Sequence, residues 1–313
     1  MNYQSHRPSV QELIVEAKNK RKIKNGEKFV PYALLAVTMV SILTTIGIVL
    51  TLIFETGVFF SQVPIKDFIL GTNWYPFSGK EPQYGVLPLI AGTLKVTCIA
   101  VLFAVPLGLS AAIYLSEYAN DKMKRVLKPV LEVLAGVPTI VYGFFALTFV
   151  TPLLQQIIPS LKIFNALSAG LVVGIMILPM IVSLSEDALS AVPKSLREGA
   201  YALGATKFET SLKIVLPAAI SGVVASIVLA ASRAIGETMI VSLAAGSTPI
   251  WDLNITGSIQ TMTSYIVQVS SGDAGYGTTI YYSIYAVGFT LFLFTLLMNF
   301  VASRVSKRFR EEY

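Results

Sequence analysis

The chain has 313 residues, of which 54% are hydrophobic and 13% are charged. Since soluble domains carry about 25% charged residues, this composition indicates a membrane protein. The single cysteine, Cys98, excludes a disulfide within the chain, and the single histidine, His6, argues against zinc binding and histidine-based catalysis. We therefore predict no metal site and no catalytic residue. The net charge of +6 alone would fit a nucleic-acid partner. The distribution of this charge along the chain argues against one.

Six segments are long and apolar enough to span a bilayer, which requires roughly 20 apolar residues. They cover residues 30–54, 87–115, 126–150, 166–184, 217–245 and 280–303. The third and fourth contain Gly136, Pro138 and Pro179, which are tolerated where neighbouring helices satisfy the freed backbone groups. The sequence therefore predicts an all-α polytopic membrane protein with six transmembrane helices.

Basic residues lie on one side of this predicted topology. They gather in both tails and in the connections between the second and third and between the fourth and fifth spans, whereas the opposite loops hold only Lys66, Lys80 and Lys162. Short loops rich in lysine and arginine face the cytoplasm, so we expect both termini there, in tails 1–29 and 304–313. The positive charge then faces anionic lipid headgroups rather than nucleic acid.

Two segments flank the first span. In the N-terminal tail, Ser9 and Glu12 fit a capping box, and the apolar spacing behind them predicts an amphipathic helix over residues 9–22. This helix either lies on a membrane or partner or is solvated.

The predicted extracytoplasmic loop, residues 55–86, is rich in aromatic residues. Such residues typically form a belt at the membrane boundary, and a docking surface for an external protein is the alternative.

The predicted core, residues 87–303, contains a polar connection at residues 185–216. Pro193 can open a helix, Gly204 can end it in a left-handed conformation, and a second helix is expected from Lys207 to Leu216. The connection is polar enough to leave the bilayer and apolar enough to bury one face on another surface. By pattern alone, it is equally an ordinary connector under its own bundle.

The fifth predicted span contains two charges, Arg233 and Glu237. Residues four apart face the same side of a helix, and a charge inside a bilayer costs several kcal/mol unless it is paired or hydrated. One interpretation is an internal ion pair that neutralises both. The other is that the pair lines a polar path through the membrane, where the planar fork of Arg233 can bind an anion and Glu237 holds the guanidinium in its absence.

The polar connection resembles the "EAA" loop of ABC-importer permeases. The residues at the motif positions are Glu198, Gly199, Ala200, Gly204, Ile214, Leu216 and Pro217. In that family, the loop forms a short cytoplasmic helix that docks on an ATPase subunit, so the resemblance implies that these residues couple the chain to ATP hydrolysis. Gly199 stands where alanine is typical. It lowers helix propensity by roughly 1 kcal/mol and preserves close approach.

From about Gly71 to the C-terminus, the chain is similar to the PstC-type permeases of phosphate ABC importers. The matching stretches are residues 73–76, 84–93, 112–118, 134–144 and 233–239. The resemblance implies a type I ABC importer permease-like fold in a bacterial inner membrane and phosphate transport by alternating access, with Arg233 and Glu237 on the substrate path. Other possible functions are an ABC permease for molybdate, sulfate or phosphonate, a stand-alone secondary transporter, and a membrane sensor.

The same resemblance implies the partners. They are a second, PstA-like permease, a PstB-like ATPase dimer and a PstS-like extracytoplasmic phosphate-binding protein, in addition to membrane lipid. The chain contains no G-x-x-x-x-G-K-[ST] phosphate loop. We therefore expect a transport subunit that is not itself an enzyme and carries no cofactor, with ATP and Mg²⁺ bound by the partner ATPase.

Overall fold

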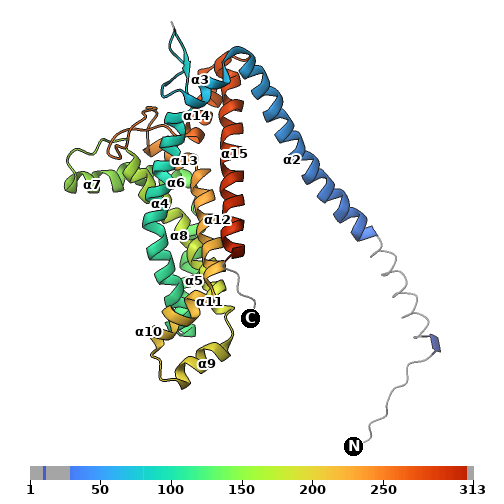
Figure 1. Ribbon diagram of the computed structural model, residues 1–313, viewed down its shortest axis with the longest axis vertical. Helices are drawn as coiled ribbons and strands as arrows, with labels where there is room; N and C mark the ends of the chain where they lie inside the picture. Colours follow the sequence, from blue (N-terminus) through green and yellow to red (C-terminus); the bar gives the residue numbers. More distant parts are fainter. Residues whose placement is uncertain (1–9, 12–28, 80, 309–313) are drawn as a thin grey trace, which may run out of the picture. The chain divides into compact units, whose positions relative to one another are not determined.

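The computed structural model describes residues 10–11, 29–79 and 81–308, and these residues are mainly helical (Figure 1). The chain divides into two compact units, Met1–Phe54 and Glu55–Tyr313, which are considered separately. The amphipathic helix predicted at residues 9–22 lies outside the described residues except for two helical positions, Val10 and Gln11.

The first long helix, α2 (Phe29–Gln62), begins in the first unit and ends in the second. Its prediction as residues 30–54 stopped too early, because the charge of Glu55 does not end the helix and Thr56 and Phe59 are buried beyond it. The predicted loop 55–86 therefore begins as helix. It continues with a short helix, α3 (Ile65–Leu70), and an antiparallel hairpin, β1 (Trp74–Tyr75) and β2 (Gln83–Tyr84).

Aromatic residues of this region form a core. Phe59, Phe68, Trp74 and Tyr84 meet edge to face, and Trp74 also packs on Tyr265 of helix α14 (Met262–Gln268). Each of the four is buried. The expectation that the aromatic residues of this loop form a membrane belt is therefore wrong for these four, and they hold the hairpin to the bundle.

The centre of the second unit is the pair α4 (Leu87–Ile113) and α8 (Ala166–Ser190). Their backbones approach closely because glycines lie at the contact. A Cβ atom on Gly108, Gly170 or Gly174 would come within 3 Å of a side chain of the other helix. In a membrane there is no hydrophobic driving force between helices, and small residues favour association because they allow close van der Waals packing. The predicted fourth span, 166–184, extends to Ser190, so the polar connection starts with the last turns of α8.

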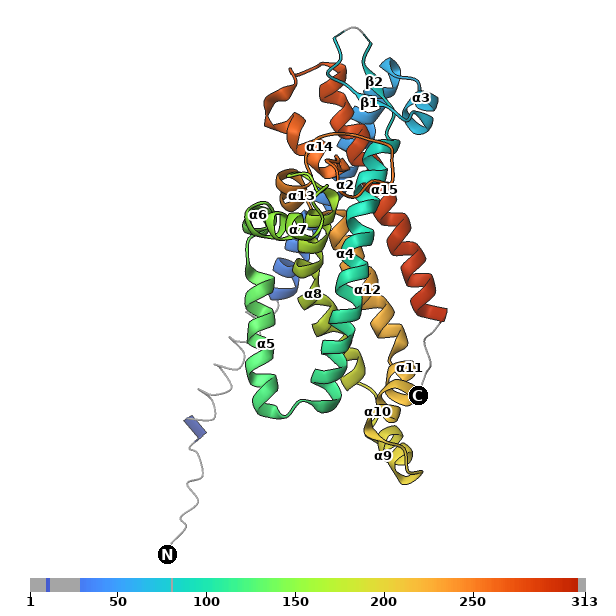
Figure 2. The same cartoon turned by 90° about the vertical axis from the view of Figure 1, so that its left-hand side faces the viewer.

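The third predicted span, residues 126–150, is not one helix. Helix α5 (Asp121–Gly136) ends before Val137, which has an extended backbone (ψ 129°) because the ring of Pro138 disfavours the helical region for the preceding residue. After the break, α6 (Thr139–Phe145), a π-helical turn η2 (Ala146–Val150) and α7 (Thr151–Ile157) follow. Figure 2 shows α5 upright and α6 and α7 running across it.

The fifth predicted span, residues 217–245, is also broken. Helix α11 (Leu216–Ala218) meets α12 (Ile220–Ile235) at a bend of 73° that separates residues 207–218 from α12, and a second break precedes α13 (Met239–Ala244). The last helix, α15 (Thr279–Arg308), is longer than predicted and packs beside α12 (Figure 1).

Within the described residues, five helices are long and apolar enough to cross a membrane, or six when the bent pair that ends in α12 is counted as one span. The prediction of an all-α polytopic protein with six spans agrees with the larger count. The third of these spans is Thr139–Ile157 rather than residues 126–150. In the second unit, the hairpin and α14 lie at one end of the bundle, called here the hairpin end. Helices α9 and α10 lie at the other end, called the loop end (Figure 2).

Candidate functional site

At the loop end, the polar connection forms the predicted helix, turn and helix. Helix α9 (Lys194–Ala202) is followed by Gly204, whose φ of +84° is the left-handed conformation that favours glycine at a helix end. Helix α10 (Lys207–Thr210) then continues through a π-helical turn, η3 (Ser211–Val215), into α11.

A capping box fixes the start of α10. The Thr206 hydroxyl accepts from the backbone N–H of Glu209, and the Glu209 carboxylate accepts from the backbone N–H of Thr206. The hydrogen bonds from the backbone and hydroxyl of Thr206, together with the nearby Lys213 ammonium, lower the pKa of Glu209 below its usual value. This box rigidifies the turn that follows Gly204.

The motif residues of the connection divide into two groups. Ala200 is buried and Leu216 is half-buried, whereas Glu198, Gly199, Gly204, Ile214 and Pro217 are exposed. A Cβ atom on Gly199 would meet nothing within 4 Å, so the close approach expected of this glycine is not required by the chain itself.

Large apolar side chains surround these exposed motif residues. Leu203 is 91% exposed and Phe208 is 65% exposed, and Tyr201 and Leu212 are also open to solvent. An exposed apolar surface bordered by charged residues is typical of a protein contact site. The geometry of the connection therefore supports docking better than an ordinary connector.

The second set of predicted site residues lies around the break between α12 and α13. Arg233 is in the last turn of α12, but Glu237 follows the end of that helix. The premise that the two share one face of a helix is therefore wrong. Among the described residues, no ion pair or hydrogen bond joins them.

Glu237 has a different set of partners. It is 8% exposed, and its carboxylate accepts from the backbone N–H groups of Met239 and Ile240 at 3.0 and 3.2 Å. Its carbonyl accepts from the Thr263 hydroxyl at 2.7 Å. The carboxylate thus satisfies the start of α13, where free N–H groups need an acceptor. This explains how a buried charge is tolerated without a cation.

Arg233 opens into a cavity of about 370 Å³ between α5, α8 and α12. Its side chain is exposed and makes no hydrogen bond or ion pair with any described residue. Lys128 lines the same cavity and pairs with the buried Glu186 at 2.7 Å. The other polar lining residues are Glu132 and Ser183. The fold therefore places a second cation, Lys128, in the wall of the cavity that Arg233 lines. The position of Lys128 in the sequence does not predict this.

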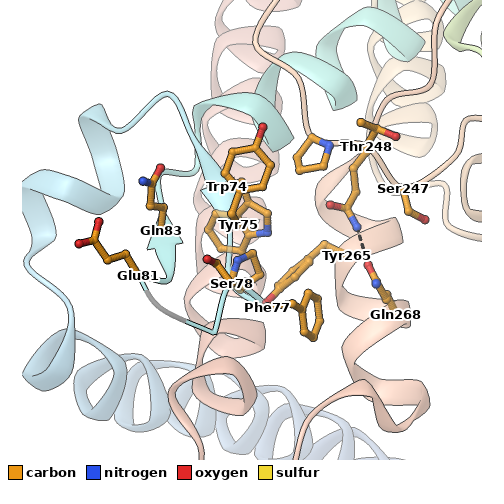
Figure 3. A pocket seen from close by; sticks show the side chains of 13 residues that line it. Trp74, Tyr75, Phe77, Ser78, Glu81, Gln83, Ser247, Thr248, Tyr265 and Gln268 are labelled. Atoms are coloured by element: carbon orange, nitrogen blue, oxygen red, sulfur yellow. Dashed lines mark hydrogen bonds between the residues drawn. The ribbon is translucent and has the colours of Figure 1, made fainter.

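A second cavity, of about 480 Å³, lies at the hairpin end (Figure 3). The aromatic side chains of Trp74, Tyr75, Phe77 and Tyr265 surround it, and Gln260 donates to Gln268 across it at 2.7 Å. The indole N–H of Trp74 is buried without a described partner. No basic residue lines this cavity within the part of the chain that the structure describes, so it is a poorer site for an anion than the cavity of Arg233.

Comparison with known proteins identifies the family. Residues 104–311 match the family described as "Binding-protein-dependent transport system inner membrane component". The chain belongs to this permease family. It is 35% identical over 300 residues to the "Probable ABC transporter permease protein YqgH" of Bacillus subtilis (strain 168), covering 95% of this chain and 96% of that relative.

Other relatives of the permease carry a more specific name. The "Phosphate transport system permease protein PstC" of Xylella fastidiosa (strain 9a5c) is 34% identical over 261 residues, which cover 77% of this chain and 78% of the relative. The corresponding protein of Haemophilus influenzae (strain ATCC 51907 / DSM 11121 / KW20 / Rd) is 38% identical over 58% of this chain and 62% of its own length. The predicted resemblance to this family is confirmed.

Solved structures agree on the fold. A chain of a bacterial alginate ABC transporter, in complex with an alginate pentasaccharide-bound periplasmic protein, superposes with a TM-score of 0.64 at 15% identity, covering 93% of this permease and 98% of that chain. An inward-facing MetNI methionine ABC transporter gives 0.56 at 19% identity, covering 71% and 96%. The type I ABC importer permease-like fold is therefore confirmed. The family makes the chain a multi-pass membrane transport subunit that works with an ATPase and a binding protein.

One contact of the permease was not foreseen from its sequence. The guanidinium of Arg197 on α9 binds the carboxylate of Glu117, which lies at the end of α4 in a π-helical turn, η1 (Tyr114–Tyr118). These residues are 80 positions apart. The only signal in the sequence is that each lies within or beside a stretch that carries the family resemblance.

Proposed function

We propose that the chain is a PstC-like permease subunit of an ATP-driven importer of inorganic phosphate. The observation that carries this proposal is the Arg233 side chain, which opens into a cavity without a hydrogen bond or ion pair to any described residue. The relatives named as phosphate transport permeases agree with an oxyanion as the substrate.

The chemistry of the cavity suits a phosphate oxyanion. A guanidinium remains charged at any physiological pH and offers several donors in one plane, which matches the oxygens of phosphate. The Lys128 ammonium adds a second positive charge to the wall. Because the Glu237 carboxylate is engaged by backbone N–H groups, Arg233 stays available to a passing anion. In this proposal, Arg233 lines the substrate path and Glu237 shapes it by holding the start of α13.

The energy for transport enters at the loop end. The surface formed by Leu203, Phe208 and the exposed motif residues around Glu198 would dock on the ATPase subunit. ATP binding would close the ATPase dimer, and the connection would move the bundle toward an outward-open state. Phosphate then enters from the binding protein, and hydrolysis returns the bundle to an inward-open state.

This function defines the assembly and its location. The complex would contain a PstA-like permease, a PstB-like ATPase dimer with ATP and Mg²⁺, and a PstS-like binding protein. The permease would lie in a bacterial inner membrane with both termini in the cytoplasm, so that the basic loop end faces anionic lipid. It would hold no cofactor of its own.

The test is phosphate uptake by the reconstituted complex with Arg233→Gln, Glu237→Gln and the double variant. We expect Arg233→Gln to lower uptake about a hundredfold or more, as for loss of a charge-assisted contact that acts during transport. The double variant should not recover, because the two side chains are not paired. Recovery of the double variant would show a structural pair and contradict the proposal.

Two controls sharpen this experiment. Arg125→Gln removes an exposed cation of α5 that donates only to the carbonyl of Asp121, and it should leave uptake unchanged. Competition by sulfate and molybdate tests the substrate. If either is taken up in place of phosphate, the chain is a permease for a different oxyanion.

A further inference from the structure

Helix α9, which carries the exposed motif residues Glu198 and Gly199, is anchored to the bundle by few side chains. Ala200 is its only buried residue, and no side chain caps its start at Pro193. The half-buried Leu196 adds an apolar contact with the cluster that contains Leu189, Val192 and Val215. The side chain of Arg197 is 16% exposed, and its guanidinium donates to three residues in two other segments of the chain.

The geometry of Arg197 uses most of its donors. Its Nε and Nη2 donate to the Glu117 carboxylate, with distances of 2.8 to 3.3 Å. Nη1 donates to the carbonyl of Val192 at 2.6 Å, and Nη2 also donates to the carbonyl of Leu189 at 2.8 Å. A guanidinium has five N–H groups arranged in a rigid fork, whereas an ammonium has three donors on a flexible stem. Lysine therefore cannot reproduce this set of contacts.

These acceptors mark the ends of the two central helices. Leu189 and Val192 lie at the end of α8, and Glu117 lies in η1 at the end of α4. Glu117 is 5% exposed, and it also accepts from the Ser116 hydroxyl at 3.2 Å. An ion pair this buried holds its geometry firmly, because removing either partner leaves the other charge without compensation. The side chain of Arg197 thus joins α9 to the ends of both α4 and α8.

The polar contacts continue from this pair toward the cavity of Arg233. The hydroxyls of Ser116 and Ser190 lie 3.4 Å apart, and Ser190 donates to Glu186 at 3.4 Å. Glu186 then pairs with Lys128 in the cavity wall at 2.7 Å. A contiguous set of side chains therefore runs from α9 to the cavity that Arg233 and Lys128 line.

We propose that Arg197 and Glu117 are a positioning pair that couples movement of α9 to the two central helices. This proposal rests on the proposed function, in which α9 docks on an ATPase. Without the pair, the ATPase still binds and hydrolyses ATP, but its movement is no longer passed to α4 and α8. Hydrolysis then proceeds without a matching transport step.

The first test compares phosphate uptake with ATP hydrolysis in the reconstituted complex carrying Glu117→Gln or Arg197→Lys. We expect the ATPase to copurify and hydrolysis to stay close to wild type, while phosphate taken up per ATP falls about tenfold or more. The matched control is Asp187→Asn. This changes an exposed acid at the same end of α8 whose carboxylate makes no hydrogen bond or ion pair with a described residue. An unchanged uptake per ATP in Glu117→Gln, or an equal loss in Asp187→Asn, would overturn the proposal.

The second test does not depend on the substrate or on the ATPase. Spin labels are placed on the full chain in lipid nanodiscs at the exposed positions Ala202 of α9 and Lys122 of α5, after Cys98→Ala removes the native thiol. We expect a narrow distribution of distances between the labels in the parent chain and in Asp187→Asn, and a broad one in Glu117→Gln. Equal widths would show that the pair does not position α9, even if the complex transports no phosphate. Failure of wild-type uptake with the expected broadening would instead overturn the proposed function alone.

Discussion

Two arginines of this permease have opposite surroundings. Arg197 is 16% exposed and gives its donors to a buried carboxylate and to two carbonyls at a helix end. Arg233 is exposed to a cavity and makes no hydrogen bond or ion pair with any described residue. A satisfied guanidinium fixes the structure around it, whereas an unsatisfied one remains available to a ligand. The two cations therefore differ in how many donors they have free, although both lie in helices of one bundle.

The sharpest way to test this contrast is stability. Arg197→Ala should lower the free energy of unfolding by about 3 kcal/mol, because it leaves the buried Glu117 without a cation. Arg233→Ala should change it by less than about 0.5 kcal/mol, as expected for a substitution that removes no hydrogen bond or ion pair with a described residue. Thermal or denaturant unfolding of the purified permease measures both. Equal losses for the two variants would contradict the contrast.

A smaller loss of stability is expected when the Glu237 carboxylate is removed. Glu237→Ala should cost about 1 to 2 kcal/mol, because two backbone N–H groups at the start of α13 lose their acceptor. A double-mutant cycle of Arg233 with Glu237 should give a coupling energy near zero, whereas the cycle of Arg197 with Glu117 should give more than about 1 kcal/mol. A large coupling between Arg233 and Glu237 would restore the ion-pair interpretation.

Two glycines of the connection should respond in opposite directions. Gly199→Ala should stabilise the permease by up to about 1 kcal/mol, since α9 gains helix propensity and a Cβ atom there meets open space. Gly204→Ala should destabilise it by about 1 kcal/mol, because its φ of +84° is unfavourable for alanine. Unfolding measurements on the isolated chain give both signs. Loss of ATPase binding in Gly199→Ala would show that a partner, rather than this chain, approaches the glycine.

The smallest expected effect is a dependence on pH. The pKa of Glu209 is lowered in the folded chain by Thr206 and Lys213, so its contribution to stability is present above the unfolded pKa, about 4.3. This contribution is lost as the pH falls through the lower folded pKa. The difference in thermal midpoint between wild type and Glu209→Gln should therefore be small at pH 6 and vanish in stronger acid. A difference that grows in acid would contradict the capping geometry.

The helices and the turn of the loop end could largely be predicted from the sequence, whereas the break between α12 and α13 near Arg233 could not. The helix, turn and helix of the connection follow from local signals, because Pro193, Gly204 and the Thr206–Glu209 box act on the backbone next to them. The shared helix face of Arg233 and Glu237 was wrongly predicted, since a continuous helix was assumed through an apolar stretch that carries no proline after Pro217. The end of α12 at Gly236 depends instead on the packing of α13 and on the cap that Glu237 provides.

By itself, the sequence determined the membrane setting, the helical class, the family and the position of the polar connection. These follow from composition, from the length of apolar segments and from motifs within short stretches. Only the tertiary structure decided which charges meet. The contact of Arg197 with Glu117 joins residues 80 positions apart, and Lys128 of α5 and Arg233 of α12 line one cavity. Electrostatic contacts act between atoms a few ångströms apart, and the distance along the chain does not reveal which atoms those are.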